Sequence, residues 1–263
     1  MSTRALRWAA VSWTATAVAS QLFFAFYVAL YYGTTAARGN IADWNKAMPH
    51  GYVAGDFMGN LVVAAHLLSA VVIILGGALQ LSPQVRRRAP RFHRWGGRVY
   101  IAAAFAVSLG GLFMVWTRGA VGGMPQHLSI SVNAGLILLC AAQALRYARL
   151  RRFDLHRRWA LRLFLVAGGV WFFRIGLMLW LAIHQGPAGF DPKTFQGPFL
   201  TFLGIAQYVL PLLTLELYLY ARDRGGPPFR AAMAAGLAML TLATACGSAV
   251  AVMGMWMPRL SRL

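Results

Sequence analysis

Histidine is the residue whose placement in this sequence most clearly suggests chemistry. The chain holds 6 histidines, and four of them lie in successive apolar stretches: His66, His93, His127 and His156. Neutral imidazole is a good axial ligand of haem iron, and two facing helices that each supply one histidine give a bis-His site suited to electron transfer. One histidine on each of four consecutive helices therefore predicts haem b, bound as two groups.

His93 and His156 begin similar stretches that read His-Arg, then Trp, then Arg. Arg and Trp are common at the headgroup level of membrane helices, but this does not explain a histidine at the same place in two helices that run in the same direction. We expect His93 to pair with His156, and His66 with His127. Because His66 lies about 8 to 10 Å deeper in its helix than His127, either the helix of His127 starts deeper or the outer site is not a haem.

Arg174 stands near the middle of an apolar stretch, where an unpaired charge costs at least about 2.5 kcal/mol. Glu216 is the leading candidate partner, although straight helices would place the two about 10 Å apart in depth. The long Arg174 side chain would also reach Asp56 by extending toward the membrane surface, and a haem propionate or an anionic substrate would also serve as its partner. Arg174 therefore belongs either to a structural ion pair between helices or to a pocket for a polar ligand, and the sequence leaves both alternatives open.

The elements that must hold these residues are membrane helices. Hydrophobic residues make up 59% of the 263 and charged residues only 12%, which leaves too little polar surface for a water-soluble domain. About 20 apolar helical residues cross a bilayer. Stretches of that kind run from Trp8 to Tyr32, Leu61 to Leu81, Val99 to Thr117, His127 to Tyr147, Trp159 to Ile183, Phe199 to Tyr220 and Ala231 to Met257.

The predicted fold is thus an all-α integral membrane protein, a bundle of about seven transmembrane helices. Most Lys and Arg residues lie before the first stretch and between stretches two and three, four and five, and six and seven, so the N-terminus is expected inside and the C-terminus outside. We expect one domain over residues 1–263, with a core of four helices at about 57–183 and peripheral helices at 8–32, 199–220 and 231–257. The net charge of +19 is then a topology signal and not a sign of nucleic-acid binding.

No sequence pattern of a hydrolase or transferase is present. HExxH, GxSxG and clustered carboxylates are missing, so no catalytic residue is assigned. The 2 cysteines, Cys140 and Cys246, lie in different apolar stretches and predict neither a disulfide framework nor a metal site. Paired glycines, such as Gly110-Gly111 and Gly168-Gly169, are typical of helices that approach closely, and would also make room for a flat cofactor.

Several of these segments resemble a bacterial family of predicted membrane proteins filed as domain of unknown function 2306. The resemblance covers about residues 50 to 180 and is carried by Gly55 to Asn60 with His66, Gly76 to Leu81, Arg86 to Tyr100, His156 to Trp159, and Arg174 in an aromatic helix. It implies the cytoplasmic membrane of a bacterium and no established activity. The helix order of the histidines is more weakly similar to that of two-haem transmembrane cytochromes of the b561 class.

Two functions from different classes follow. The first is a transmembrane electron carrier with haem b at bis-His sites, with the iron held by His66, His93, His127 and His156, Arg174 beside the cofactor, and a quinone or a redox protein as partner. The second is a non-redox membrane protein, either an accessory subunit of a larger complex or a small transporter that uses Arg174 and Glu216. The lack of a clear inverted repeat argues mildly against a transporter.

Overall fold

The structure, a computed structural model, describes residues 2–263 and is all-helical over this range. This confirms the predicted fold class. The helices are α1 Ser2–Ala37, α2 Phe57–Leu81, α3 Pro83–Arg88, α4 Pro90–Arg118, α5 Gly123–Arg149, α6 Phe153–Ala167, α7 Gly169–His184, α8 Pro198–Asp223, α9 Pro227–Ala251 and α10 Met257–Leu260, with a 3-10 turn η1 at Ile41–Lys46 and a π turn η2 at Val252–Trp256.

Six of these helices are long and apolar enough to cross a membrane, and α6 with α7 form a seventh candidate that is bent by 50° at a break. Each predicted apolar stretch lies within these elements, so the expected number of spans is confirmed. The stretch from Trp159 to Ile183 differs from expectation, because it is two helices and not one straight helix.

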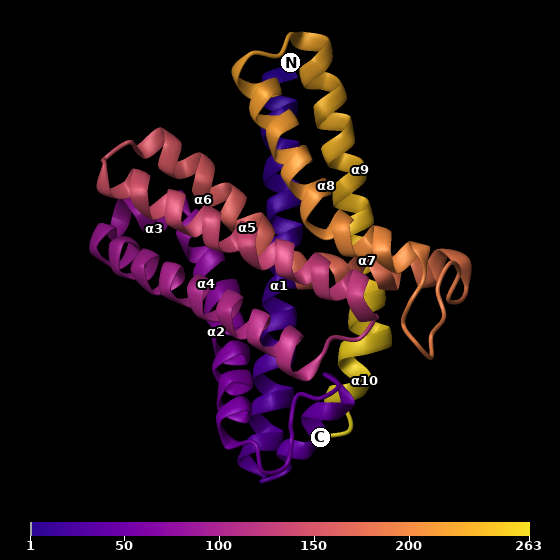
Figure 1. Cartoon of the computed structure of the whole chain (residues 1–263). Helices are drawn as coiled ribbons and strands as arrows, with labels where there is room; N and C mark the ends of the chain where they lie inside the picture. The colour runs from indigo at the N-terminus through magenta and orange to yellow at the C-terminus, as the bar shows by residue number, and fades with distance from the viewer. Residues whose placement is uncertain (1) are drawn as a thin grey trace.

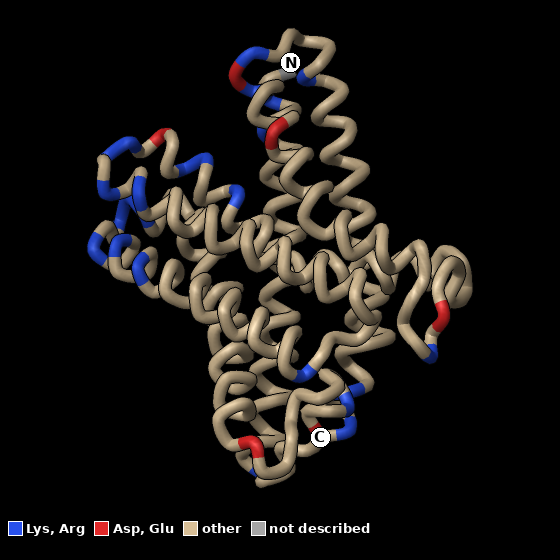
Figure 2. Tube along the Cα trace, viewed as in Figure 1, with Lys and Arg blue, Asp and Glu red and all other residues tan. Residues whose placement is uncertain are grey.

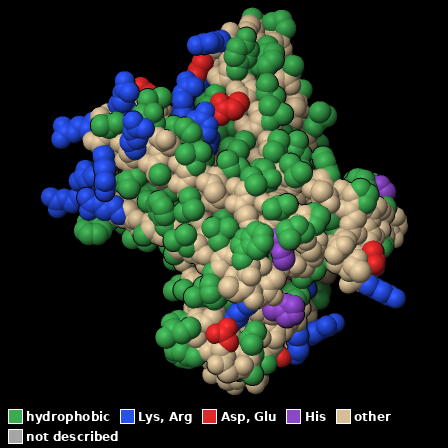
Figure 3. Space-filling view, in the orientation of Figure 1, with side chains coloured by type: hydrophobic (Ala, Val, Ile, Leu, Met, Phe, Trp, Pro, Cys, Tyr) green, Lys and Arg blue, Asp and Glu red, His purple; other side chains and the backbone are tan. Residues whose placement is uncertain are grey.

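Charged residues gather at the ends of the helices. Lys and Arg cluster around α3, the start of α4 and the α5–α6 turn, and again around the N-terminus and the α8–α9 turn, as Figure 2 shows. Hydrophobic side chains cover much of the surface between these clusters (Figure 3). Exposed apolar residues such as Leu68 and Leu242 are suited to lipid, since a water-soluble surface would not keep so many. Which end faces the cytoplasm stays a prediction.

Local sequence sets several helix starts. The Asp56 carboxylate accepts a hydrogen bond from the Gly59 amide at 2.9 Å, which caps α2. Ser82 caps α3 in the same way. Pro90 opens α4, where its missing N–H costs nothing, and this places His93 in the first turn of that helix as the sequence predicted.

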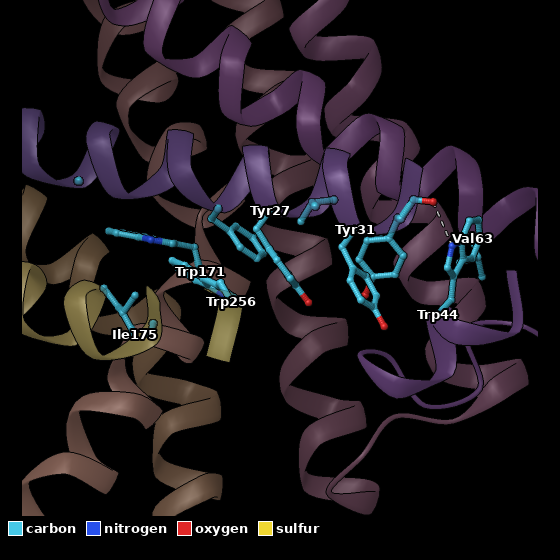
Figure 4. Packing of buried hydrophobic residues seen from close by; sticks show 12 residues of the cluster. Tyr27, Tyr31, Trp44, Val63, Trp171, Ile175 and Trp256 are labelled. Carbon is cyan, nitrogen blue, oxygen red and sulfur yellow. Dashed lines mark hydrogen bonds between the residues drawn. The ribbon is translucent and has the colours of Figure 1, made fainter. Parts of the chain in front are cut away.

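Helix α1 runs the length of the molecule and packs along α9 (Figure 1). Its aromatic side chains form the largest buried cluster together with residues of η1, α2, α7 and η2. Tyr27, Trp171 and Trp256 lie side by side there, and the Tyr27 and Trp256 ring centroids are 6.2 Å apart (Figure 4). A second buried cluster joins α2, α4, α5, α6 and α8 around Tyr100. The helices that carry the histidines are therefore packed against one another, and α2 also packs against α1.

Candidate functional site

His66 lies in α2 with its ring against a glycine pair on α4. A Cβ atom at Gly110 would lie 3.4 Å from the His66 Cβ, and one at Gly111 would lie 3.4 Å from the His66 Cε1. The Nδ1 atom is buried and has no hydrogen-bond partner in residues 2–263. The glycine pair thus makes room for the imidazole as well as for close helix packing.

His127, its expected partner, is held by the turn between α4 and α5. The Nε2 atom accepts a hydrogen bond from the Ala120 amide at 2.8 Å, and the ring meets Trp116 edge to face at 5.8 Å between centroids. An imidazole nitrogen that accepts this bond has no lone pair left for a metal. In this arrangement His66 and His127 engage different neighbours, and their pairing stays a prediction.

His93 and His156 are better placed for a shared task. His156 Nδ1 lies 2.9 Å from the Ala144 carbonyl of α5, so this nitrogen donates and the Nε2 atom keeps its lone pair. His93 Nδ1 is buried and has no partner in the part of the chain that the structure describes. The pairing of these two histidines and the binding of haem between them stay predictions.

Neither expected carboxylate is the partner of Arg174. Glu216 binds Arg162 of α6 at 2.7 Å, and Asp56 binds Arg118 at 2.6 Å. Both carboxylates are thus taken up by other arginines, and the sequence had already indicated a mismatch in depth between Glu216 and Arg174. The Arg174 guanidinium instead lies over the Phe24 ring, 5.2 Å from its centroid, and no carboxylate in residues 2–263 is within ion-pair distance.

The Asp56–Arg118 pair ties the loop before α2 to the end of α4. Arg118 is 6% exposed and also donates to the carbonyl of Gly51 at 2.8 Å and to the amide oxygen of Asn60 at 3.0 Å. The hydrogen bond from Arg118, helped by the Gly59 amide, holds the pKa of Asp56 below its usual value. These bonds give the cluster a structural role, since they join the loop before α2 to the end of α4, although the buried Arg118 Nε has no partner in residues 2–263.

The break between α6 and α7 is a polar spot between apolar helices. Gly168 and Gly169 leave no side chain there, and three buried amide side chains from other helices fill the space: Gln21 of α1, Asn133 of α5 and Gln207 of α8. The Gln21 Nε2 lies 3.1 Å from where a Cβ of Gly168 would stand, and Asn133 Nδ2 lies 2.6 Å from the corresponding point at Gly169. Side chains at either glycine would therefore clash or displace these amides.

A cavity of about 520 Å³ borders this break. It lies among α1, α6, α7, α8 and α9, and most of its lining is leucine, alanine and aromatic side chain. Its polar lining residues are Thr14, Gln207, Thr214, Tyr218, Arg222 and Thr244. Pro211 also lines it, and because proline has no N–H, the Gln207 carbonyl one turn earlier lacks its usual helical donor.

Neither this cavity nor the break was predicted from the sequence. The signals were present in Gly168-Gly169, which lies within a predicted span, and in Pro211 within another. The four histidines and Arg174 do not line the cavity. The structure thus contains two separate candidate sites: the inner histidine pair and the cavity with its polar end.

Comparison with known proteins identifies the family. The family model described as "Predicted membrane protein (DUF2306)" matches residues 63–194, which is half of the chain, and the chain belongs to this family. No curated protein and no solved structure was found to match. The weaker similarity to b561-class cytochromes gains no support from these comparisons. The matched segment includes all four predicted haem ligands, Arg174 and the α6–α7 break, while α1, α8 and α9 lie outside it.

Proposed function

We propose that this DUF2306 protein binds an amphipathic, lipid-soluble molecule in the cavity among α1, α6, α7, α8 and α9. The observation that carries the proposal is a space of about 520 Å³, mostly apolar but with several polar side chains, such as Gln207 and Thr214, along its lining. Binding sites for small molecules are concave and mainly apolar, with a few polar groups that fix orientation. The role is then that of a binding or carrier protein in the membrane, which falls in the non-redox class that the sequence offered as the alternative to electron transfer.

The polar groups argue against a groove that merely holds lipid tails. Hydrocarbon chains need no hydrogen bonds, and a polar group left unpaired among them costs free energy. The Gln207 carbonyl, freed by Pro211, and the hydroxyls of Thr214 and Thr244 offer hydrogen bonds to something that enters from the membrane. A molecule with both an apolar chain and a polar group uses both kinds of lining.

A pair of matched tryptophan variants tests the proposal. Thr214 lines the cavity, so Thr214→Trp places an indole in it, whereas Leu213 is 53% exposed on the same helix and Leu213→Trp leaves the cavity open. Each protein is purified in mild detergent and extracted with organic solvent, and the co-purified small molecules are identified by mass spectrometry. We expect a compound that is retained by wild type and Leu213→Trp but several-fold depleted in Thr214→Trp.

The same experiment can refute the proposal. Equal amounts of every extracted compound in all three proteins would mean that the cavity holds only bulk lipid or detergent. Thermal unfolding of the three proteins in the same detergent serves as the control, because a Thr214→Trp protein that unfolds early is replaced by Thr214→Leu.

A second candidate function is electron transfer through haem b at His93 and His156. It is favoured by one observation: His156 Nδ1 donates to a backbone carbonyl, which orients the ring and leaves Nε2 as the nitrogen that would bind a metal, as in haem and metal sites generally. The buried, unpartnered Nδ1 of His93 is a second nitrogen in need of a partner. When bound, haem would supply one-electron chemistry, and these two side chains would hold its iron.

An absorption spectrum before and after dithionite tests this second function. We expect a reducible b-type spectrum in wild-type protein made with ample haem, and its loss in His93→Ala and His156→Ala. His184→Ala is the matched control, because His184 is exposed at the end of α7. Protein that carries no haem under these conditions would exclude the electron-transfer function and leave the cavity proposal intact.

A further inference from the structure

The first two turns of α4 carry three arginines and a tryptophan on one face. Arg91, Arg94, Trp95 and Arg98 are separated by three or four residues, a spacing that places side chains next to one another on a helix. All four residues are exposed, and a hollow of about 330 Å³ lies among them. The Arg98 guanidinium lies over the Trp95 ring, 5.0 Å from its centroid, which orients both side chains. The structure thus shows room for a ligand group between guanidinium groups.

No carboxylate in residues 2–263 neutralises these three arginines. The ion pairs there all use other basic residues, and they occupy Asp43, Asp56, Asp154, Glu216 and Asp223. The sixth acidic residue, Asp191, accepts hydrogen bonds from Lys193 and Thr194 within the loop between α7 and α8. The start of α4 therefore presents positive charge that the protein itself does not balance.

This arrangement destabilises the helix unless an anion is bound. Arg94 has a like charge three residues before it and another four residues after it, and such neighbours on a helix repel one another. The three arginines also lie near the N-terminus of α4, which begins at Pro90 and has no side-chain cap, and cations there oppose the helix dipole. A basic bias at one side of the membrane requires arginines at this end of α4 but not their alignment around one hollow. An anion in the hollow would offset the repulsion and the dipole together.

The same face of α4 continues as an exposed apolar stripe. Residues spaced by seven positions on this face are Trp95, Ala102, Leu109 and Trp116, and the last two are 57% and 55% exposed. Arg98 and Trp116 lie about 27 Å apart along the helix, close to the thickness of the hydrocarbon core. The arginines thus lie at the level of the lipid head groups and Leu109 at that of the acyl chains. Figures 2 and 3 show the basic side chains gathered at this end of the molecule, next to a hydrophobic surface.

We propose that this face of α4 binds one anionic phospholipid, whose phosphate lies in the hollow among Arg91, Arg94 and Arg98 and whose acyl chains follow the stripe toward Leu109. Guanidinium groups form paired hydrogen bonds with phosphate oxygens. Basic pockets at the ends of membrane helices bind the head groups of anionic lipids, which the bilayer itself supplies. The hollow shares no lining residue with the cavity, so this proposal does not depend on the function proposed for the cavity.

Native mass spectrometry of the delipidated protein in mild detergent tests the site. The probes are phosphatidylglycerol and phosphatidylcholine with identical acyl chains, which share the phosphate and differ in net charge. We expect the first molecule of phosphatidylglycerol to bind about tenfold more tightly than phosphatidylcholine, because the choline group brings a positive charge to the guanidiniums. Added salt should weaken this preference, since the site is exposed.

The triple variant Arg91→Gln, Arg94→Gln, Arg98→Gln should reduce the preference to about twofold or less. Its control is the triple variant Arg149→Gln, Arg151→Gln, Arg152→Gln, which removes the same charge from exposed positions around the α5–α6 turn, away from the hollow. The control should keep the tenfold preference. In detergent the proteins are compared without regard to how each was oriented in the membrane.

A single substitution replaces the triple variant if that protein does not fold. Arg94→Glu places a carboxylate in the hollow, where it repels the phosphate, and the same loss of preference is expected. Arg149→Glu is its control and should bind the two lipids as wild type does.

Three results would overturn the site. Equal binding of the two lipids by wild type would mean that the arginines do not select an anionic lipid. An equal loss of preference in both triple variants would assign it to the overall charge of the protein and not to the hollow. Displacement of phosphatidylglycerol by an equimolar amount of glycerol 3-phosphate would make a soluble phosphate compound, and not a lipid, the occupant.

Discussion

Replacing Arg174 by methionine should stabilise the protein. In residues 2–263 its guanidinium has no carboxylate partner, and its one strong contact is the face of the Phe24 ring at 5.2 Å. Methionine is similar in length, fills the same space and carries no charge. The substitution therefore removes an uncompensated charge from a helix of the bundle without opening a large hole.

The size of the effect follows from two opposing contributions. An unpaired arginine at the centre of a membrane helix costs about 2.5 to 3.5 kcal/mol, and its interaction with an aromatic face returns about 0.5 to 2 kcal/mol. The net expectation for Arg174→Met is a gain of about 1 to 2 kcal/mol in the free energy of unfolding. If Arg174 binds an anionic ligand, the gain will be smaller when that ligand is present.

Unfolding by SDS in mixed micelles, followed by tryptophan fluorescence, measures this free energy. Arg162→Met is the matched control, because Arg162 binds Glu216 at 2.7 Å and lies 4.8 Å from the Trp159 ring centroid. Its loss should destabilise by about 1 kcal/mol. A less stable Arg174→Met protein would contradict the reasoning, since only the loss of a true partner of Arg174 would have that effect.

Three further predictions concern the packing, the loop before α2 and the orientation. Gly247→Ala should destabilise the protein by about 1 to 3 kcal/mol, because its Cβ would lie 2.6 Å from the Ile175 carbonyl. Gly236→Ala on the same helix meets nothing within 4 Å, and it should stabilise the protein by about 0.5 to 1 kcal/mol. Thermal unfolding of the two variants compares them. The lowered pKa of Asp56 means that its bond to Arg118 stabilises the fold fully above the ordinary carboxyl value of 3.8 and is lost as the pH falls through the lowered value. Asp56→Asn should therefore show less loss of stability than wild type below that pH, and parallel unfolding curves for the two would contradict it. Finally, a C-terminal alkaline phosphatase fusion should be active and a C-terminal green fluorescent protein fusion dark if the Arg-rich ends of the helices lie inside; the reverse pattern would invert the topology.

The helices could be predicted from the sequence because spanning is a local property. A run of about 20 apolar residues must be helical in lipid, whatever it packs against. For the same reason the start of α4 at Pro90 was predictable from one residue. The expectation that His93 pairs with His156 rests on the direction of the helices, which alternates in a bundle, and stays a prediction.

The partners of Arg174 and the cavity could not be predicted in this way. Which arginine Glu216 meets depends on the depth and rotation of α6 and α8, and a shift of one helical turn is about 5.4 Å. The cavity depends on how α1, α6, α7, α8 and α9 pack together, which no single segment encodes. The bend at Gly168 had a local signal, but glycine pairs also occur in straight, closely packed helices, and only the tertiary structure separates the two cases.

Helix α6 joins the two candidate sites and keeps them separable. His156 in its first turn faces α5, where its Nδ1 reaches the Ala144 carbonyl, while Leu161 and Leu165 line the cavity on its other side. The end that carries His156 is fixed to α8 by Arg158–Asp223 at 2.5 Å and by Arg162–Glu216. Substitutions at His156 should therefore leave ligand retention in the cavity unchanged, and Thr214→Trp should leave any haem spectrum unchanged. Only a change that frees α6 from α8, such as the double variant Arg158→Met, Arg162→Met, should disturb both sites together, because α6 forms a wall of each.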